Sequence, residues 1–317
     1  MAHAVWGPVC GCRGARQRYV LRMAPLLPTP LVRPDWVAAH LDHPALRLVD
    51  ASYHLPSAGR NARAEYAAAH PPGAVFADLD HLSDEAAPYP HTLPDPRVLA
   101  ERLGALGIGD DQLVVVYDGS GQQFSAPRLW WMLHTLGHRQ VAVLDGGLPA
   151  WARAGYPVTS EVPAVTPAVF TPRWDRSRWR DLAAMRALVA DGGGAASGAQ
   201  VVDARSPGRF AATEPEPRAG VRGGHHPGAR SVHYATLVGG DGFTLPPEAL
   251  RARFAQAGVR LDAPIVASCG SGITACAVLL ALEVAGARET AVYDGSWTEW
   301  GSQADTPVET GPPGAAG

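Results

Sequence analysis

One cysteine stands where the chain passes from an apolar run into a glycine-rich turn. Ile265-Val266-Ala267-Ser268 leads into Cys269-Gly270-Ser271-Gly272-Ile273-Thr274-Ala275, and an apolar helical stretch follows from Cys276 to Ala285. This order predicts a strand, a small-residue loop and a helix, with loop N–H groups and the positive helix end facing the sulfur. Such surroundings favour the thiolate, which is the nucleophilic form of cysteine.

A buried structural cysteine is the alternative interpretation of Cys269. It gives no reason for the glycines on either side of Ser271, whereas glycine allows a loop to turn its N–H groups toward one point. Cys276 falls inside the apolar stretch and is expected to be inert core. Cys10 and Cys12 lie in a Gly/Arg-rich segment without a second ligand pair, so no zinc site is expected there.

Composition narrows the class of protein. The 317 residues suffice for about two domains, and 46% apolar with 18% charged residues is typical of a globular protein. A net charge of −3 gives no reason to expect a nucleic-acid partner. No apolar run is long enough to span a bilayer, and residues 1–23 lack the apolar core of a secretory signal. With only four cysteines, we expect a reduced, cytoplasmic setting.

The second half of the chain repeats the first. Four pairs of segments match in order, at offsets between 149 and 155 residues. The pairs are Leu48-Val49-Asp50 with Val201-Val202-Asp203, His70-Pro71-Pro72-Gly73 with His225-His226-Pro227-Gly228, Tyr117-Asp118-Gly119-Ser120-Gly121 with Ser268-Cys269-Gly270-Ser271-Gly272, and Leu144-Asp145-Gly146 with Tyr293-Asp294-Gly295. A duplicated domain is the simplest account.

Each half alternates short apolar strands with helical stretches, which predicts an α/β fold with a mainly parallel sheet flanked by helices. The expected helices are Asp35–Leu41, Pro96–Leu106, Asp181–Ala190 and Pro247–Ala257. We expect five segments: a disordered extension over 1–29, a first domain over 30–153, an ordered connector over 154–180, a second domain over 181–310 and a frayed end over 311–317. Met23 is the expected true start.

The two halves differ at the reactive position. Asp118 stands in the first half where Cys269 stands in the second. Because a carboxylate cannot act as a sulfur nucleophile, only the second domain is predicted to be catalytic. A cysteine-dependent phosphatase would need an arginine six residues after the cysteine; Ala275 stands there, which disfavours phosphoryl transfer.

The chain resembles the tandem-rhodanese sulfurtransferases, and among them the enzymes that act on 3-mercaptopyruvate. The resemblance runs from about residue 30 to residue 309. The segments that carry it are Cys269 to Ala275, Gly208-Arg209-Phe210, Thr213-Glu214-Pro215-Glu216-Pro217-Arg218 and Tyr293-Asp294-Gly295-Ser296-Trp297-Thr298-Glu299-Trp300. It implies two tandem rhodanese-like domains. Thiosulfate-preferring relatives carry arginine and lysine directly after the cysteine, where this chain has Gly270 and Ser271.

The resemblance also implies site residues. Arg209 and Arg218 match the substrate-binding arginines, with surface ion-pair partners as the alternative interpretation. Gly270, Gly272, Ile273 and Thr274 would complete the substrate loop. Ser271 would assist proton transfer with a histidine and an acid from the first domain, matched here to His70 and to position 61, which is Asn61 rather than aspartate. His225, the counterpart of His70, is expected to be structural.

The function implied is sulfur transfer from 3-mercaptopyruvate through a Cys269 persulfide to cyanide, a thiol or thioredoxin, with release of pyruvate and with no metal or organic cofactor. Persulfide formation followed by discharge is covalent catalysis with ping-pong order. Two alternatives stay open. One is a thiosulfate sulfurtransferase; the more distant one is a non-enzymatic sulfur-carrier or binding module.

Overall fold

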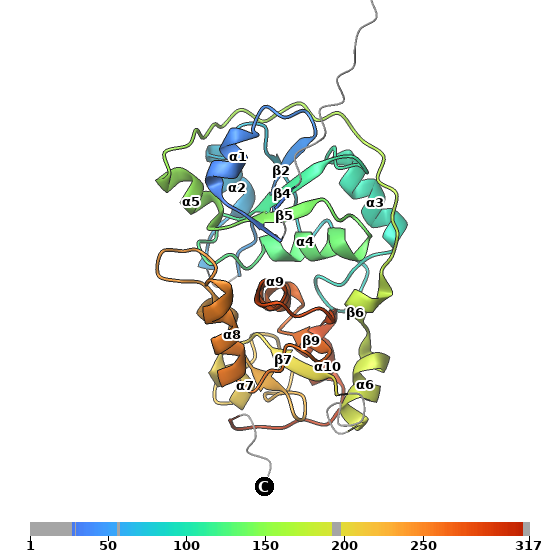
Figure 1. Ribbon diagram of the computed structural model, residues 1–317. Coiled ribbons are helices and arrows are strands. Elements are labelled where there is room, and N and C mark those ends of the chain that lie inside the picture. Colours follow the sequence, from blue (N-terminus) through green and yellow to red (C-terminus); the bar gives the residue numbers. More distant parts are fainter. Residues whose placement is uncertain (1–26, 29, 56–57, 192–197, 313–317) are drawn as a thin grey trace, which may run out of the picture.

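The computed structural model describes residues 27–28, 30–55, 58–191 and 198–312 (Figure 1). The expectations for Cys10, Cys12, Met23 and residues 313–317 lie outside these residues. Within them the chain forms two five-stranded sheets whose paired strands all run parallel. The α/β architecture expected from the alternating pattern is therefore confirmed.

The first domain is built on a sheet of order β1-β5-β4-β2-β3. Its strands are β1 (Leu31–Val32), β2 (Leu46–Asp50), β3 (Val75–Phe76), β4 (Leu113–Tyr117) and β5 (Val141–Leu144). Its helices are α1 (Pro34–Ala39), α2 (Ala62–Ala68), α3 (Pro96–Ala105), α4 (Ala126–Thr135) and α5 (Gly147–Arg153). Every residue of β4 and β5 is buried, as expected for parallel strands covered on both faces.

The second domain repeats this arrangement with the order β6-β10-β9-β7-β8. Its strands are β6 (Trp179–Arg180), β7 (Gln200–Asp203), β8 (Arg230–Ser231), β9 (Ile265–Ser268) and β10 (Thr290–Tyr293). Its helices are α6 (Leu182–Ala190), α7 (Pro207–Ala211), α8 (Pro247–Gln256), α9 (Ile273–Ala285) and α10 (Ser296–Ser302), with short 3-10 turns η2 (Arg176–Arg178) and η3 (Tyr234–Leu237). The two sheets share one strand order, as a duplication requires.

Local sequence explains where the helices begin. Asp95 and Asp181 accept backbone N–H groups of the first turns of α3 and α6, and proline opens α1, α3 and α8. These helices lie within two residues of their expected bounds. Helix α9 differs, because it begins at Ile273 and not at Cys276. Gly272 has a φ of 85°, which lets the chain pass directly from the cysteine loop into the helix.

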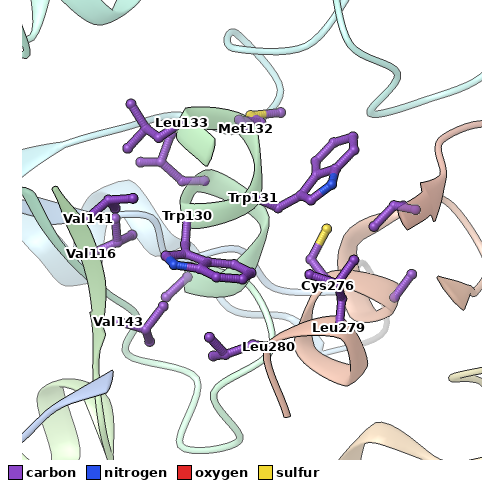
Figure 2. Packing of buried hydrophobic residues seen from close by; sticks show 14 of the residues in the cluster. Val116, Trp130, Trp131, Met132, Leu133, Val141, Val143, Cys276, Leu279 and Leu280 are labelled. Carbon is purple, nitrogen blue, oxygen red and sulfur yellow. The ribbon is translucent and has the colours of Figure 1, made fainter. Parts of the chain in front are cut away.

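One hydrophobic core runs through both domains, because α4 packs against α9 between the two sheets (Figure 1). Figure 2 shows Trp130 of α4 between valines of the first sheet and Leu280 of α9. Trp130 and Trp131 are both fully buried, so separating the domains would expose two large aromatic side chains. The domains therefore form one packed unit, and residues of either can reach a site between them.

The segment between the domains follows the outside of the first domain (Figure 1). Backbone hydrogen bonds attach it along its length: Thr159 pairs with His70, Ala168 N–H donates to Gly104, and Arg173 N–H donates to Leu136. These bonds attach the segment between α5 and η2 to the first domain.

Candidate active site

Cys269 lies at the carboxyl end of β9, at the start of the turn into α9. Its side chain is almost fully buried, and its sulfur accepts the Gly272 N–H at 3.1 Å. The backbone of the turn is held from α10: Cys269 N–H donates to the Ser296 hydroxyl, and the Thr298 hydroxyl donates to the Gly270 carbonyl. The sulfur therefore sits in a fixed loop at the N-terminal end of a 13-residue helix.

A cavity of about 470 Å³ opens above this loop. Its lining includes Cys269, Gly270, Ser271, Ile273 and Thr274 of the turn, Arg205, Ser206, Arg209, Pro215, Pro217, Arg218, His233 and Tyr234 of the same domain, and Tyr53, Leu55 and Phe124 of the first domain. All of the predicted substrate-binding residues except Gly272 are in this lining. Both domains contribute to the cavity, so the site is complete only when they are packed together.

The two predicted arginines enter this cavity with different partners. Arg209, from α7, donates to Glu216 at 2.6 Å and is only partly exposed. Its guanidinium lies so close to the cysteine turn that a Cβ added to Gly270 would sit 3.0 Å from Arg209 Nη2. Arg218 donates to the Thr298 hydroxyl at 3.3 Å, and no carboxylate of the described residues lies within ion-pair distance of it. The ion-pair interpretation thus applies to Arg209 but not to Arg218.

Ser271 is hydrogen-bonded to a histidine, but this histidine is not the expected one. His91 Nδ1 lies 2.8 Å from Ser271 Oγ, and His91 Nε2 lies 3.1 Å from Asp80 Oδ1. The hydrogen bond from His91 lowers the pKa of the Asp80 carboxyl. His91 is buried and has a φ of 64°, a left-handed conformation in which histidine occurs more readily than most residues. Ser271, His91 and Asp80 therefore form a hydrogen-bonded series that crosses from the second domain to the first.

The match of His70 to this role is wrong on geometry. His70 is fully buried, its two ring nitrogens lie 2.6 Å and 3.1 Å from the carbonyl oxygens of Tyr66 and Glu161, and its ring stacks on Tyr66. Neither nitrogen is left for Ser271. His225 is placed in the same way in the second domain, bonded to the Phe210 carbonyl and stacked on that ring. The two histidines thus share a structural position in the repeat.

Asn61, which seemed to replace an acid, has a local task. Its side chain accepts the Ala64 N–H and caps α2. The acid next to the site histidine is Asp80, so the asparagine at position 61 leaves no gap in the site. The missed pair lies in the loop between β3 and α3, which has neither helical nor strand periodicity. Polar residues in such a loop, with no counterpart in the repeat, were the available signal.

A buried ion pair holds this loop against the cysteine turn. Arg128 of α4 is fully buried and donates to Asp294 at 2.8 Å, to the His91 carbonyl and, at 3.4 Å, to the Gly272 carbonyl. Asp294 also accepts the Leu93 N–H at 2.7 Å. Because an unpaired buried charge costs several kcal/mol, these contacts fix His91 relative to Ser271.

Cys276 does not share the surroundings of Cys269. It is fully buried in α9 (Figure 2), and burial raises the pKa of its thiol to about 12. In the described part of the chain, no group of three or more His, Cys, Asp or Glu side chains is arranged to hold a metal ion. The helices of that same part include none that is both long and apolar enough to cross a bilayer.

The comparison with known families decides what this architecture is. A model of the rhodanese-like domain matches residues 33–154 and 186–303. The chain belongs to the rhodanese family. It carries two rhodanese-like domains in tandem, as the internal repeat and the resemblance both predicted.

Named relatives of the rhodanese chain include two kinds of sulfurtransferase. The human 3-mercaptopyruvate sulfurtransferase is 41% identical over 282 residues, covering 87% of this chain and 93% of the relative. A thiosulfate sulfurtransferase of Cricetulus griseus is 41% identical over 294 residues, covering 90% and 97%. The crystal structure of SseA from Escherichia coli matches with a TM-score of 0.76 and 37% identity, over 84% of this chain and 98% of that one. Overall similarity therefore leaves the sulfur donor open.

Proposed function

We propose that this chain is a sulfurtransferase that takes sulfur from 3-mercaptopyruvate, carries it as a persulfide on Cys269, and passes it to a thiol or cyanide while releasing pyruvate. The observation that carries the proposal is the composition of the cavity around Cys269. Two arginines face a turn whose residues Gly270 and Ser271 are uncharged. A donor with one carboxylate and a ketone suits this cavity, since arginine binds planar oxygen pairs with directed N–H groups.

In the first half-reaction the Cys269 thiolate attacks the sulfur of the donor. A sulfur–sulfur bond forms, the carbon–sulfur bond breaks, and its electron pair passes into the ketone to give the enolate of pyruvate. The enolate oxygen carries new negative charge, which Arg209 and Arg218 stabilise from the cavity wall. The outer sulfur keeps its own proton, so Cys269 ends as a neutral persulfide.

The proton that the Cys269 thiol loses is carried by the hydrogen-bonded series Ser271–His91–Asp80. Ser271 takes the proton of the Cys269 thiol and relays it to His91, whose Nδ1 lies 2.8 Å from the serine oxygen. Asp80, 3.1 Å from Nε2, stabilises the imidazolium. The same path then returns the proton to the methylene carbon of the enolate, which completes pyruvate. Thiol and donor thus become persulfide and pyruvate without an outside proton source.

In the second half-reaction an acceptor thiolate or cyanide attacks the outer sulfur. The sulfur–sulfur bond to Cys269 breaks, and its electron pair returns to the cysteine as thiolate. The N–H of Gly272, 3.1 Å from the Cys269 sulfur, stabilises that leaving group. Reduced thioredoxin is our proposed acceptor in a cell. The cytoplasm is our proposed location, because a chain with four cysteines is typical of a reducing compartment.

Thiosulfate is the second candidate donor, because relatives named for it match this chain as closely. Thiosulfate is a dianion and would favour cations in the cysteine turn, where this chain has none. The non-enzymatic alternative is disfavoured, because Cys269 is present and buried at the base of a cavity. The test is kcat/KM for both donors on one preparation, with cyanide as acceptor. We expect 3-mercaptopyruvate to be preferred by at least about tenfold, the difference that one charge-assisted hydrogen bond supplies; a preference for thiosulfate would overturn the donor assignment.

A further inference from the structure

A chain of alternating charges runs from the core of the second domain into the cavity. Asp203, at the end of β7, pairs with Arg205 at 2.6 Å, and both side chains are fully buried. Arg205 pairs in turn with Glu216 at 2.6 Å. Glu216 then accepts from Arg209, whose Nη2 lies 2.6 Å and whose Nε lies 3.3 Å from its two oxygens. Arg209 is the last member of this series of ion pairs and lines the cavity.

Glu216 is the shared member of this chain. Only 4% of its side chain is exposed. Its Oε1 accepts from both Arg205 and Arg209, and its Oε2 accepts from Arg209. A carboxylate bound this way fixes the plane of each guanidinium, because the N–H directions of arginine are rigid. Its contacts with Arg209 therefore determine which N–H groups of that arginine stay available to the donor.

The charges around the cavity also depend on Glu216. The cavity is lined by Arg205, Arg209 and Arg218. The carboxylate of Asp203 pairs with Arg205, and that of Glu216 pairs with Arg209. Among the described residues, Arg218 alone of these three arginines has no ion-pair partner. The lining thus presents one uncompensated positive charge, which suits a monoanion better than a dianion.

We propose that Glu216 is a positioning and specificity residue that acts through Arg209: it orients the guanidinium above the Cys269 turn and neutralises its charge, so that the cavity selects a monocarboxylate donor. This inference rests on the proposed function. It assigns the choice of donor to the residue behind Arg209 as well as to the neutral turn itself.

The test is Glu216→Gln, which keeps the size and an oxygen acceptor but removes the charge. Persulfide formation on Cys269 is followed by stopped flow against donor concentration, for 3-mercaptopyruvate and for thiosulfate. We expect the half-saturating concentration of 3-mercaptopyruvate to rise about tenfold, while that of thiosulfate is unchanged or falls, because Arg209 is left as a second uncompensated cation. Discharge of the persulfide to cyanide should keep its rate.

The matched control is Glu214→Gln. Glu214 lies two residues away in the same segment and is exposed, and its carboxylate accepts from the Ser206 hydroxyl at 2.7 Å. It should leave the half-saturating concentrations of both donors unchanged. The proposal is overturned if Glu216→Gln leaves the ratio of the two donors as in the wild type, or if Glu214→Gln changes that ratio equally.

Glu216→Asp covers the case in which the glutamine variant does not fold. It keeps the charge and shortens the reach, so the half-saturating concentration of 3-mercaptopyruvate should rise several-fold without a relative gain for thiosulfate. An aspartate variant with wild-type values for both donors would also overturn the proposal. A wild-type enzyme that prefers thiosulfate would overturn the donor assignment instead, and the change in ratio on substitution would still test Glu216.

Discussion

The two domains close the same turn with different groups. In the first domain the Asp118 carboxylate accepts the N–H groups of Ser120, Ser125 and Ala126 at 2.9–3.1 Å and the Ser120 hydroxyl at 2.5 Å. In the second, the Cys269 sulfur accepts one N–H, from Gly272. In the first domain, the N–H groups of the turn are therefore bound by the side chain of Asp118. The same loop is held together by a carboxylate in one domain and carries the proposed nucleophile in the other.

The strand that precedes the cavity shows a second difference. Asp50 at the end of β2 accepts the Ser52 N–H, and burial raises the pKa of its carboxyl to about 6. The matching Asp203 has Arg205 two residues later, and although burial opposes ionisation, this guanidinium keeps the pKa of Asp203 below its usual range. Among the residues that the structure describes, it is therefore the second domain that continues a series of ion pairs from a strand-end aspartate into the cavity. The first domain instead contributes to the surroundings of the cysteine turn, through His91, Asp80 and Arg128.

Removing the Cys269 sulfur should have the largest effect on the difference between the two turns. Cys269→Ser should lower pyruvate formation at least about 10⁴-fold, because serine cannot carry a persulfide and Asp118 offers no substitute nucleophile. Mass spectrometry after donor treatment should find one added sulfur on the wild-type peptide with Cys269 and none on the variant. Cys276→Ser is the control and should retain most activity. Sulfur found on Cys276, or activity retained by Cys269→Ser, would contradict the assignment.

The next test separates the roles of His70 and His91. His91→Asn should slow persulfide formation about 100-fold, since it breaks the proton path from Ser271, and it should change the pH profile of that step. His70→Asn should keep the rate but lower the melting temperature, because the buried His70 ring bonds two backbone carbonyls. Stopped-flow kinetics and calorimetry on both variants measure this. The opposite pattern would restore His70 to the site.

The turns themselves can be compared by stability. Asp118→Ala should lower the free energy of unfolding by about 2–4 kcal/mol, because three backbone N–H groups and a hydroxyl lose their acceptor. Cys269→Ala loses one weak acceptor and should cost about 1 kcal/mol or less in the same measurement. Urea denaturation of both variants checks the difference. Equal losses would mean that Asp118 does not hold its turn.

The smallest effect concerns the two strand-end aspartates. Because the pKa of Asp50 is raised to about 6 in the folded chain, the unfolded chain releases this proton first, and stability falls as pH rises from about 4 to 6. Asp50→Asn should therefore gain about 1–2 kcal/mol relative to wild type at pH 8 and little at pH 4. Asp203→Asn should lose stability at pH 8, since Arg205 would be left buried beside a neutral group. Denaturant unfolding at pH 4 and pH 8 measures the free energy of unfolding of each variant. An effect of Asp50→Asn that is the same at both pH values would contradict a raised pKa of Asp50.

The repeat, several helices and strands, and the turn at Cys269 could be predicted from residue types, because each follows from residues that are close together in the chain. The alternation of apolar runs with helical stretches predicted α1, α3, α6 and α8 and the buried strands, and the segment from Ser268 to Thr274 predicted a cysteine at a helix start. Helix α9 was the main difference in bounds, since the φ of Gly272 starts it three residues early.

Which first-domain residues reach that turn depends on the folded packing of the two domains. His70 and His91 both stand beside prolines, and spacing cannot tell which ring faces Ser271, 180 residues from His91. Packing decides it: His70 stacks on Tyr66, whereas the contacts of Arg128 bring the carbonyl of His91 to the cysteine turn. The sharing of Glu216 between two arginines is likewise a property of buried geometry. Hydrogen bonds between distant segments depend on direction as well as residue type, and direction is set by the folded core.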